Sequence, residues 1–307
     1  MEAQIAAALF LFGLIFGSFL NVCIYRLPRD LSVSNPRRSA CPHCRRQIAF
    51  YDNIPVVSWL VLRGRCRHCQ AAISLRYLLI EVLTGVLFVA CYWHFGLTLA
   101  ALKYCVLAFL LLGLIFTDAE TKLLPDKLTL PGIAIGLVFS LLVPVNDLAS
   151  QFLPGVVSMP VSSEVSWRFL SLLDSLLGAA VGASFIYGAG AIYLRARGIE
   201  GMGFGDVKLM AMIGAFLGVK LTVLTIFTAS IAGSLFGLST ILVVWIKRTR
   251  RFVRRHAPLR EARQRAWQSA QAVYRHYEMP FGVFLGTMAM LAFFFGNQFL
   301  QWYWRLL

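Results

Sequence analysis

The chain has 307 residues, of which 59% are hydrophobic and only 14% are charged. Soluble domains of this length carry more charge, so the composition predicts a membrane protein with several spanning helices. The formal net charge of +15 raises nucleic acid as a partner. The basic residues, however, cluster beside apolar runs, as in loops that face an anionic leaflet. We therefore expect a lipid bilayer with an anionic inner leaflet as the partner surface, and no nucleic acid.

Apolar runs predict an all-α polytopic membrane protein with about eight transmembrane helices. The candidate spans are Ile5–Tyr25, Tyr77–Phe95, Leu97–Thr117, Leu128–Val143, Leu170–Leu194, Val207–Gly218, Leu221–Ile246 and Phe281–Phe299. The first run lacks a basic n-region and a clear cleavage site, so we interpret it as a retained helix rather than a signal peptide. The run Val207–Gly218 is short for a span of about 20 residues, and we expect it to begin deep in the membrane or to line a cavity.

Charge counting orients these helices. With the N-terminus outside, 25 of the 29 basic residues fall in segments on the inside, as the positive-inside rule requires. The basic insert 247–279 also lies inside. Its apolar residues recur at helical spacing, so we expect an amphipathic helix on the inner leaflet, with a solvated loop as the alternative.

The polar segment Leu27–Arg76 is the only part that resembles a small soluble domain, and it contains four cysteines in two C-x-x-C pairs. They are Cys41, Cys44, Cys66 and Cys69, with 21 residues between the pairs. Four thiolates in this arrangement can close a tetrahedral site around structural Zn²⁺. Disulfides or reduced thiols are the alternative, which the cytoplasmic side disfavours.

A glycine-rich loop, Gly201-Met202-Gly203-Phe204-Gly205-Asp206, separates two apolar runs. A turn between helices is the simplest interpretation. An ionisable residue at membrane depth, however, indicates a functional site with a partner. Asp118 is the candidate partner, because parity places the ends of both helices at the inner leaflet. Two neighbouring carboxylates share a proton, which allows one to act as base and the other as acid. From helix-end fields we expect Asp206 to be the anion at rest.

Taken together, the motifs resemble the type IV prepilin leader peptidase/N-methyltransferase family of intramembrane aspartic proteases. Gly203-Phe204-Gly205-Asp206 fits its G-x-G-D motif, and Asp118 with Leu123-Leu124-Pro125-Asp126 fits D-x(4)-L-L-P-D. The other matching motifs are Gly17-Ser18-Phe19-Leu20-Asn21, Arg26-Leu27-Pro28, the cysteine pairs, Tyr51-Asp52-Asn53-Ile54-Pro55 and Pro280-Phe281-Gly282. The basic insert and the outer loop Pro144–Phe169 are longer than in the family pattern.

The resemblance implies an enzyme of the bacterial inner membrane with its active site at the cytoplasmic face. It would cleave the basic leader of type IV prepilins and type II secretion pseudopilins after a glycine, with Asp118 and Asp206 as catalytic residues. Gly201, Gly203 and Gly205 would let the substrate approach the backbone. Asp126 is interpreted as a helix N-cap instead.

A second activity implied by the resemblance is N-methylation of the new N-terminus with S-adenosylmethionine. Candidate cofactor residues at the inner ends of the first two helices are Asn21, Arg26, Glu81 and Gly85. For Glu81, an ion pair with Arg76 or Arg26 is an equal alternative. We expect residues 1–96 to form the methyltransferase-associated part and residues 97–307 the peptidase domain.

Three rival functions remain open on the sequence. A transporter with Asp118 and Asp206 as an ion relay predicts internal repeats, and we find none. A presenilin-like protease of general membrane stubs would need no four-cysteine module. The third rival is a non-enzymatic zinc-bearing assembly scaffold, and a peptidase assay on a prepilin substrate separates all three.

Overall fold

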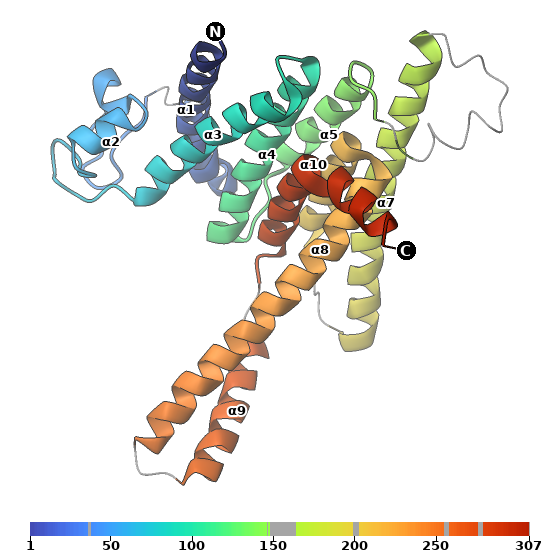
Figure 1. The fold of residues 1–307 in the computed structure, drawn as a ribbon. Coiled ribbons are helices and arrows are strands. Elements are labelled where there is room, and N and C mark those ends of the chain that lie inside the picture. The colour runs from blue at the N-terminus through green and yellow to red at the C-terminus, as the bar shows by residue number, and fades with distance from the viewer. Residues whose placement is uncertain are drawn as a thin grey trace.

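The computed structural model describes residues 1–35, 38–145, 147, 164–198, 203–254, 258–275 and 279–306, and these are largely helical (Figure 1). The helices are α1 (Glu2–Arg26), α2 (Val57–Val61), α3 (Leu75–Phe95), α4 (Leu99–Thr121), α5 (Asp126–Ser140), α7 (Glu164–Arg197), α8 (Phe204–Val253), α9 (Leu259–Arg275) and α10 (Phe281–Trp304). Short 3₁₀ helices cover Leu27–Arg29 and Phe50–Asn53. The expected all-helical fold class is confirmed.

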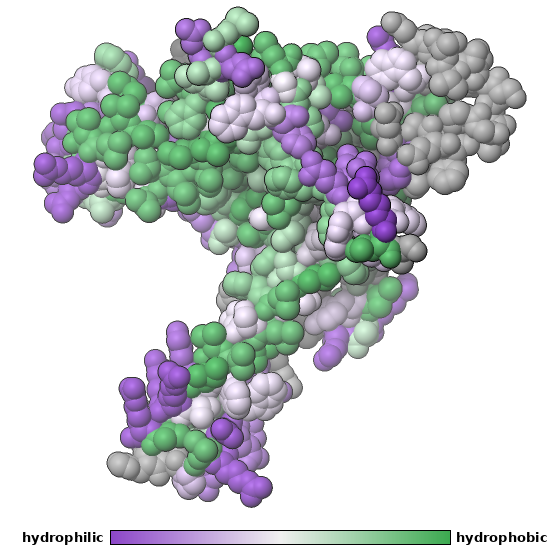
Figure 2. Space-filling model, in the orientation of Figure 1, coloured by the Kyte–Doolittle hydropathy of each residue, from purple (hydrophilic) through white to green (hydrophobic). Residues whose placement is uncertain are grey.

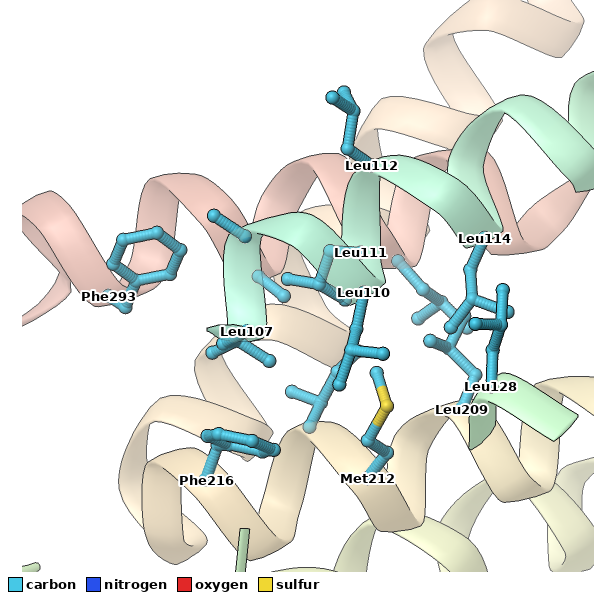
Figure 3. Packing of buried hydrophobic residues seen from close by; sticks show 14 of the residues in the cluster. Leu107, Leu110, Leu111, Leu112, Leu114, Leu128, Leu209, Met212, Phe216 and Phe293 are labelled. Carbon is cyan, nitrogen blue, oxygen red and sulfur yellow. The ribbon is translucent and has the colours of Figure 1, made fainter. Parts of the chain in front are cut away.

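Helix α4 lies at the centre of the bundle, where it contacts α1, α3, α5 and α10. Its residues Leu107, Leu111 and Leu114 are at most 1% exposed, as expected for a helix that is apolar all round. Figure 3 shows the α4 leucines packed against side chains from three other helices: Leu128, Leu209, Met212, Phe216 and Phe293. Close packing on every side fixes the position of the last turn of α4, which contains Asp118.

The expected count of eight full spans is not confirmed. Each of the eight apolar runs is largely helical, but six helices in the described part of the chain have the length and composition to cross a membrane. Helix α5 has 15 residues, a length of about 22 Å against a hydrocarbon core of about 30 Å. The runs Val207–Gly218 and Leu221–Ile246 belong to the single 50-residue helix α8.

Helix α8 is nevertheless divided at Gly218, which has non-helical angles, φ 78° and ψ −178°. A positive φ favours glycine, and a Cβ at this position would lie 2.7 Å from Oδ2 of Asp147. The same Oδ2 accepts the backbone N–H of Lys220 at 2.7 Å. Asp147 therefore caps the second segment of α8 from outside the helix. The short first segment, Phe204–Leu217, begins at the glycine-rich loop.

The basic insert forms a helical hairpin, which corrects the expectation of a helix lying on the inner leaflet. In Figure 1, α9 runs back along the far end of α8, and the pair projects from the bundle. Ala262, Ala266 and Ala270 are at most 2% exposed, and Nε1 of Trp245 donates to the Arg263 carbonyl at 3.1 Å. Because its alanine face packs against α8, α9 does not have that face free for lipid. Figure 2 shows the hydrophilic surface at the end of this hairpin.

Candidate functional site

Asp118 lies in the last turn of α4 and is only 5% exposed. Its Oδ2 accepts the backbone N–H of Val283 at 3.0 Å. Val283 is in the first turn of α10, where backbone N–H groups have no partner within the helix. A Cβ built at the neighbouring Gly282 would lie 2.9 Å from the same oxygen. The start of α10 is thus in direct contact with the Asp118 carboxylate.

Asp206 lies in the first turn of α8 and is 9% exposed. Its backbone N–H donates to the Gly203 carbonyl at 3.1 Å, which closes the first turn of the helix. Asp118 is close enough to Asp206 for their charges to interact. The structure therefore brings together the two aspartates that the sequence analysis paired.

Leu124 packs between the elements that carry the two aspartates. A Cβ at Gly205 would lie 2.9 Å from the Leu124 Cβ, and one at Gly282 would lie 3.3 Å from Leu124 Cδ1. The loop after α4 is therefore in contact with the N-termini of both α8 and α10. The small size of the two glycines permits this approach, and it keeps Asp118 and Asp206 at one end of the bundle.

The expectation that only Asp206 faces a helix N-terminus is incomplete. Asp118 is at the C-terminal end of its own helix, but it also faces the N-terminus of α10 through Val283. Both carboxylates therefore lie at positive helix ends. The position of each aspartate in its own helix does not indicate which of the two is charged at rest. The sequence does contain a signal for this contact, the motif Pro280-Phe281-Gly282. Its proline favours the start of a helix, and that helix is α10.

The interpretation of Asp126 as an N-cap is wrong. Pro125 is the N-cap of α5 and Asp126 is its first residue. Both carboxylate oxygens of Asp126 accept from Nζ of Lys208, at 2.6 and 2.8 Å. This ion pair joins the start of α5 to α8, where Lys208 is two residues after Asp206, and 55% of the Asp126 side chain is exposed.

The three candidate glycines have different outcomes. Gly201 lies outside the described residues. Gly203 is the N-cap of α8 with φ −74° and ψ 147°, angles open to any residue, and a Cβ there would meet no atom of the described residues closer than 3.9 Å. Gly205 is packed against Leu124. Among the described residues, space for a side chain is therefore present at Gly203 and not at Gly205.

The four cysteines of the polar segment converge. The Sγ atoms of Cys41, Cys44, Cys66 and Cys69 all lie within 4.8 Å of one another. Those of Cys41 and Cys69 are 3.7 Å apart, close to the roughly 3.8 Å that a tetrahedral site with bonds of about 2.3 Å requires. The donor set therefore fits a metal ion.

Two short turns with the same hydrogen bonds hold these cysteines. In the first, Cys41 N–H donates to the Arg46 carbonyl, and Arg45 N–H donates to the Cys41 carbonyl. In the second, Cys66 N–H donates to Ala71 and Gln70 N–H donates to Cys66. Arg45 and Gln70 both have positive φ, 58° and 56°. The module thus consists of two equivalent knuckles that face each other.

The structure gives each candidate cofactor residue a contact within the protein, but Gly85 lies near the middle of α3 and not at its inner end as expected. Asn21 donates to the Tyr77 carbonyl at 3.1 Å, and Arg26 donates to the carbonyls of Ser32 and Val33. Gly85 lies against α1, where a Cβ would lie 2.8 Å from the ring of Phe10. Arg76 forms its ion pair with Glu120 instead of Glu81.

Glu81 binds the polar segment through a strained residue. Its Oε2 accepts the N–H of Val56 at 2.7 Å. Val56 has φ 63° and ψ −53°, and Val57 N–H donates to the Pro55 carbonyl at 2.6 Å, so Val56 is the centre of a γ-turn. Positive φ is a genuine outlier for a β-branched residue. The sequence analysis missed this contact, although Tyr51-Asp52-Asn53-Ile54-Pro55 pointed to the loop.

The fold and the site define a class of protein: a polytopic helical bundle with two buried aspartates at one end, the arrangement expected of an intramembrane aspartic protease. Comparison with known families agrees. The bacterial peptidase A24 N-terminal domain matches residues 11–95, and the type IV leader peptidase family matches residues 105–238.

Named relatives make the identification more specific. The chain is 33% identical to the prepilin leader peptidase/N-methyltransferase of Aeromonas hydrophila, covering 96% of this chain and 92% of the relative. It is 37% identical to the protein of that name from Neisseria gonorrhoeae, covering 78% and 82%, and 35% identical to that of Pseudomonas aeruginosa, covering 74% and 78%. This chain therefore belongs to the prepilin leader peptidase/N-methyltransferase family. No solved structure matches it.

Proposed function

We propose that this protein cleaves the leader of type IV prepilins and type II secretion pseudopilins and then methylates the new N-terminal amine. The observation that supports cleavage most directly is the meeting of Asp118 and Asp206 at one end of the bundle, both at most 9% exposed. The names of the relatives supply the substrate class and the second activity.

In the proposed reaction, the two aspartates share one proton. The charged carboxylate removes a proton from water as the water oxygen attacks the carbonyl carbon of the scissile peptide, and the protonated carboxyl donates its proton to the carbonyl oxygen. The tetrahedral intermediate then collapses, the C–N bond breaks, and the amine leaves with a proton. Gly203, which has room beside it, is proposed to receive the extended substrate chain.

We propose that Cys41, Cys44, Cys66 and Cys69 hold a structural Zn²⁺. All four positions of a tetrahedral site are filled by protein thiolates, so the metal would stabilise the two knuckles rather than act on a substrate. The S-adenosylmethionine implied by the name of the relatives would supply the methyl group. Asn21, Arg26, Glu81 and Gly85 remain its proposed surroundings, with residues 1–96 as the methyltransferase-associated part and 97–307 as the peptidase domain.

The proposed location is the bacterial inner membrane, with the N-terminus outside and the aspartate pair at the cytoplasmic face. The anionic leaflet and the five basic residues between Lys247 and Arg254 in the described part of the hairpin are complementary in charge. The substrate's own apolar helix would provide most of its affinity, because a basic leader is repelled by a basic inner face.

Mass spectrometry of a prepilin expressed together with this protein tests both activities at once. A product shortened by its leader and heavier by one methyl group supports the whole proposal. A shortened product without the methyl group removes the methyltransferase, and an intact prepilin removes the peptidase.

A further inference from the structure

The first turn of α10 contacts Asp118, one of the two aspartates, through a backbone N–H group. Val283 N–H donates to Oδ2 of Asp118 at 3.0 Å, across 165 positions of sequence. Since the first N–H groups of a helix have no partner within it, this donor is directed at Asp118 by the position of α10 itself. A backbone donor from a packed helix is fixed in direction, whereas a side-chain donor has to be ordered first.

Gly282 permits that contact. A Cβ there would lie 2.9 Å from Oδ2 of Asp118, closer than real Cβ contacts allow, and 3.2 Å from its Cγ, which is tighter than most. Any larger residue would therefore push the carboxylate away from its present position. Phe281 precedes this glycine and Pro280 caps the helix, so the chain turns into α10 directly beside Asp118.

We propose that Gly282 and Val283 are positioning residues for the peptidase reaction. The Val283 amide holds Oδ2 of Asp118, and the absence of a side chain at Gly282 leaves room for it. Oδ2 held in this way fixes the orientation of the Asp118 carboxylate, whichever of the two aspartates carries the shared proton. The inference rests on the proposed peptidase function, and it adds a role for the N-terminus of α10 that neither aspartate motif contains.

Helix α10 also provides a matched control. Gly286 lies one turn further along and faces α4 as well, but a Cβ there would meet Cγ1 of Ile115, at 2.6 Å. Both glycines therefore pack α10 against α4, and only Gly282 touches the carboxylate. Comparing Gly282→Ala with Gly286→Ala separates displacement of Asp118 from a change in helix packing.

The experiment measures kcat, KM and melting temperature on a prepilin substrate for the full-length wild type and both variants. We expect Gly282→Ala to lose about 100-fold in kcat, the effect of misplacing a catalytic group by roughly 1 Å. Its KM and melting temperature should match those of Gly286→Ala, whose kcat should stay close to that of the wild type. Equal loss of kcat in both variants, or wild-type kcat in Gly282→Ala, overturns the proposal.

A second variant removes the donor without adding an atom. Replacing Val283 by its α-hydroxy acid during cell-free synthesis converts the N–H into an ester oxygen. Loss of a hydrogen bond to a charged group should lower kcat about tenfold to a hundredfold at unchanged KM, and unchanged kcat overturns the role of the amide. A wild-type protein that cleaves no prepilin contradicts the proposed function, which is a different outcome from active but insensitive variants.

Discussion

Gly178 of α7 and Gly214 of α8 pack with their backbones in direct contact. A Cβ on either glycine would overlap the carbonyl oxygen of the other. The close approach continues on both sides of this pair: a Cβ at Gly178 would also lie 2.8 Å from Cα of Gly218, and a Cβ at Gly182 would lie 2.7 Å from the Met210 carbonyl oxygen. Small residues at a spacing of four let membrane helices approach closely. This contact holds the segment of α8 that carries Asp206.

Gly214→Val should therefore separate α7 from α8 and lower stability. The expected cost is about 1–3 kcal/mol or more, as for other overpacked sites, seen as a fall in melting temperature in detergent. Gly188→Ala in α7 is the control, because a Cβ there meets nothing within 4 Å. Equal melting temperatures for the two variants would mean that the glycine contact does not stabilise the bundle.

Neutralising either aspartate should abolish peptide cleavage. In Asp118→Asn and Asp206→Asn the amide cannot exchange a proton with water or the carbonyl oxygen, so we expect no detectable product with the fold retained. Asp126→Asn is the matched control, since Asp126 binds Lys208 at an exposed position, and it should keep most activity. Cleavage near the wild-type rate in either of the first two variants would rule out the aspartate mechanism.

The glycines before Asp206 should respond differently to substitution. Gly203→Val should abolish cleavage while the melting temperature stays unchanged, because the backbone is ordinary there and space is present. Gly205→Val should lower both, since it displaces Leu124. The measurement is activity and melting temperature on each variant. An active Gly203→Val would remove the proposed substrate role of that residue.

Removing one thiolate should release the metal. Cys41→Ser leaves three ligands, and structural zinc supplies much of the folding free energy of such modules. We expect elemental analysis to find zinc in the wild type and little in the variant, with methylation reduced more than cleavage. Cys23→Ala is the control, since Cys23 is buried in α1 away from the cluster. Wild-type protein without zinc would contradict the proposed metal.

Protease digestion tests the proposed orientation. The second segment of α8, Val219–Val253, is about 50 Å long at 1.5 Å per residue, so it extends beyond a hydrocarbon core of about 30 Å. With the N-terminus outside, trypsin should cut the basic hairpin in inverted membrane vesicles. Sealed right-side-out vesicles should protect it, and detergent should remove that protection. Cleavage in intact right-side-out vesicles would reverse the topology.

The sequence was sufficient where a short motif carries the chemistry. Asp206 follows its glycines directly, and each cysteine pair forms a local turn, so residue spacing alone identified them. Parity of the helices then predicted that Asp118 and Asp206 share one end of the bundle. The helical periodicity of the basic insert likewise predicted α9.

Contacts between segments that lie far apart in the chain could not be predicted from the sequence. The Val283 amide carries no residue identity, and its partner Asp118 is 165 positions away. Asp126 has the residue type of an N-cap, but Lys208 from α8 binds its carboxylate. The alanine face of α9 would suit either a lipid surface or a neighbouring helix, and only the three-dimensional path of α8 decides between them. The kink at Gly218 depends in the same way on Asp147.

The γ-turn at Val56 limits what a fragment of this protein can reproduce. The described backbone hydrogen bonds of the two knuckles join residues within 39–73, so a peptide of residues 27–74 contains both partners of each. Val56 is different, because its conformation costs about 1–3 kcal/mol and its amide partner, Glu81, belongs to α3. Spectroscopy on the excised peptide would report the metal ligands faithfully and the loop beside them in a relaxed shape. Only the intact chain, in which Glu81 of α3 accepts the Val56 N–H, holds that loop in the γ-turn conformation.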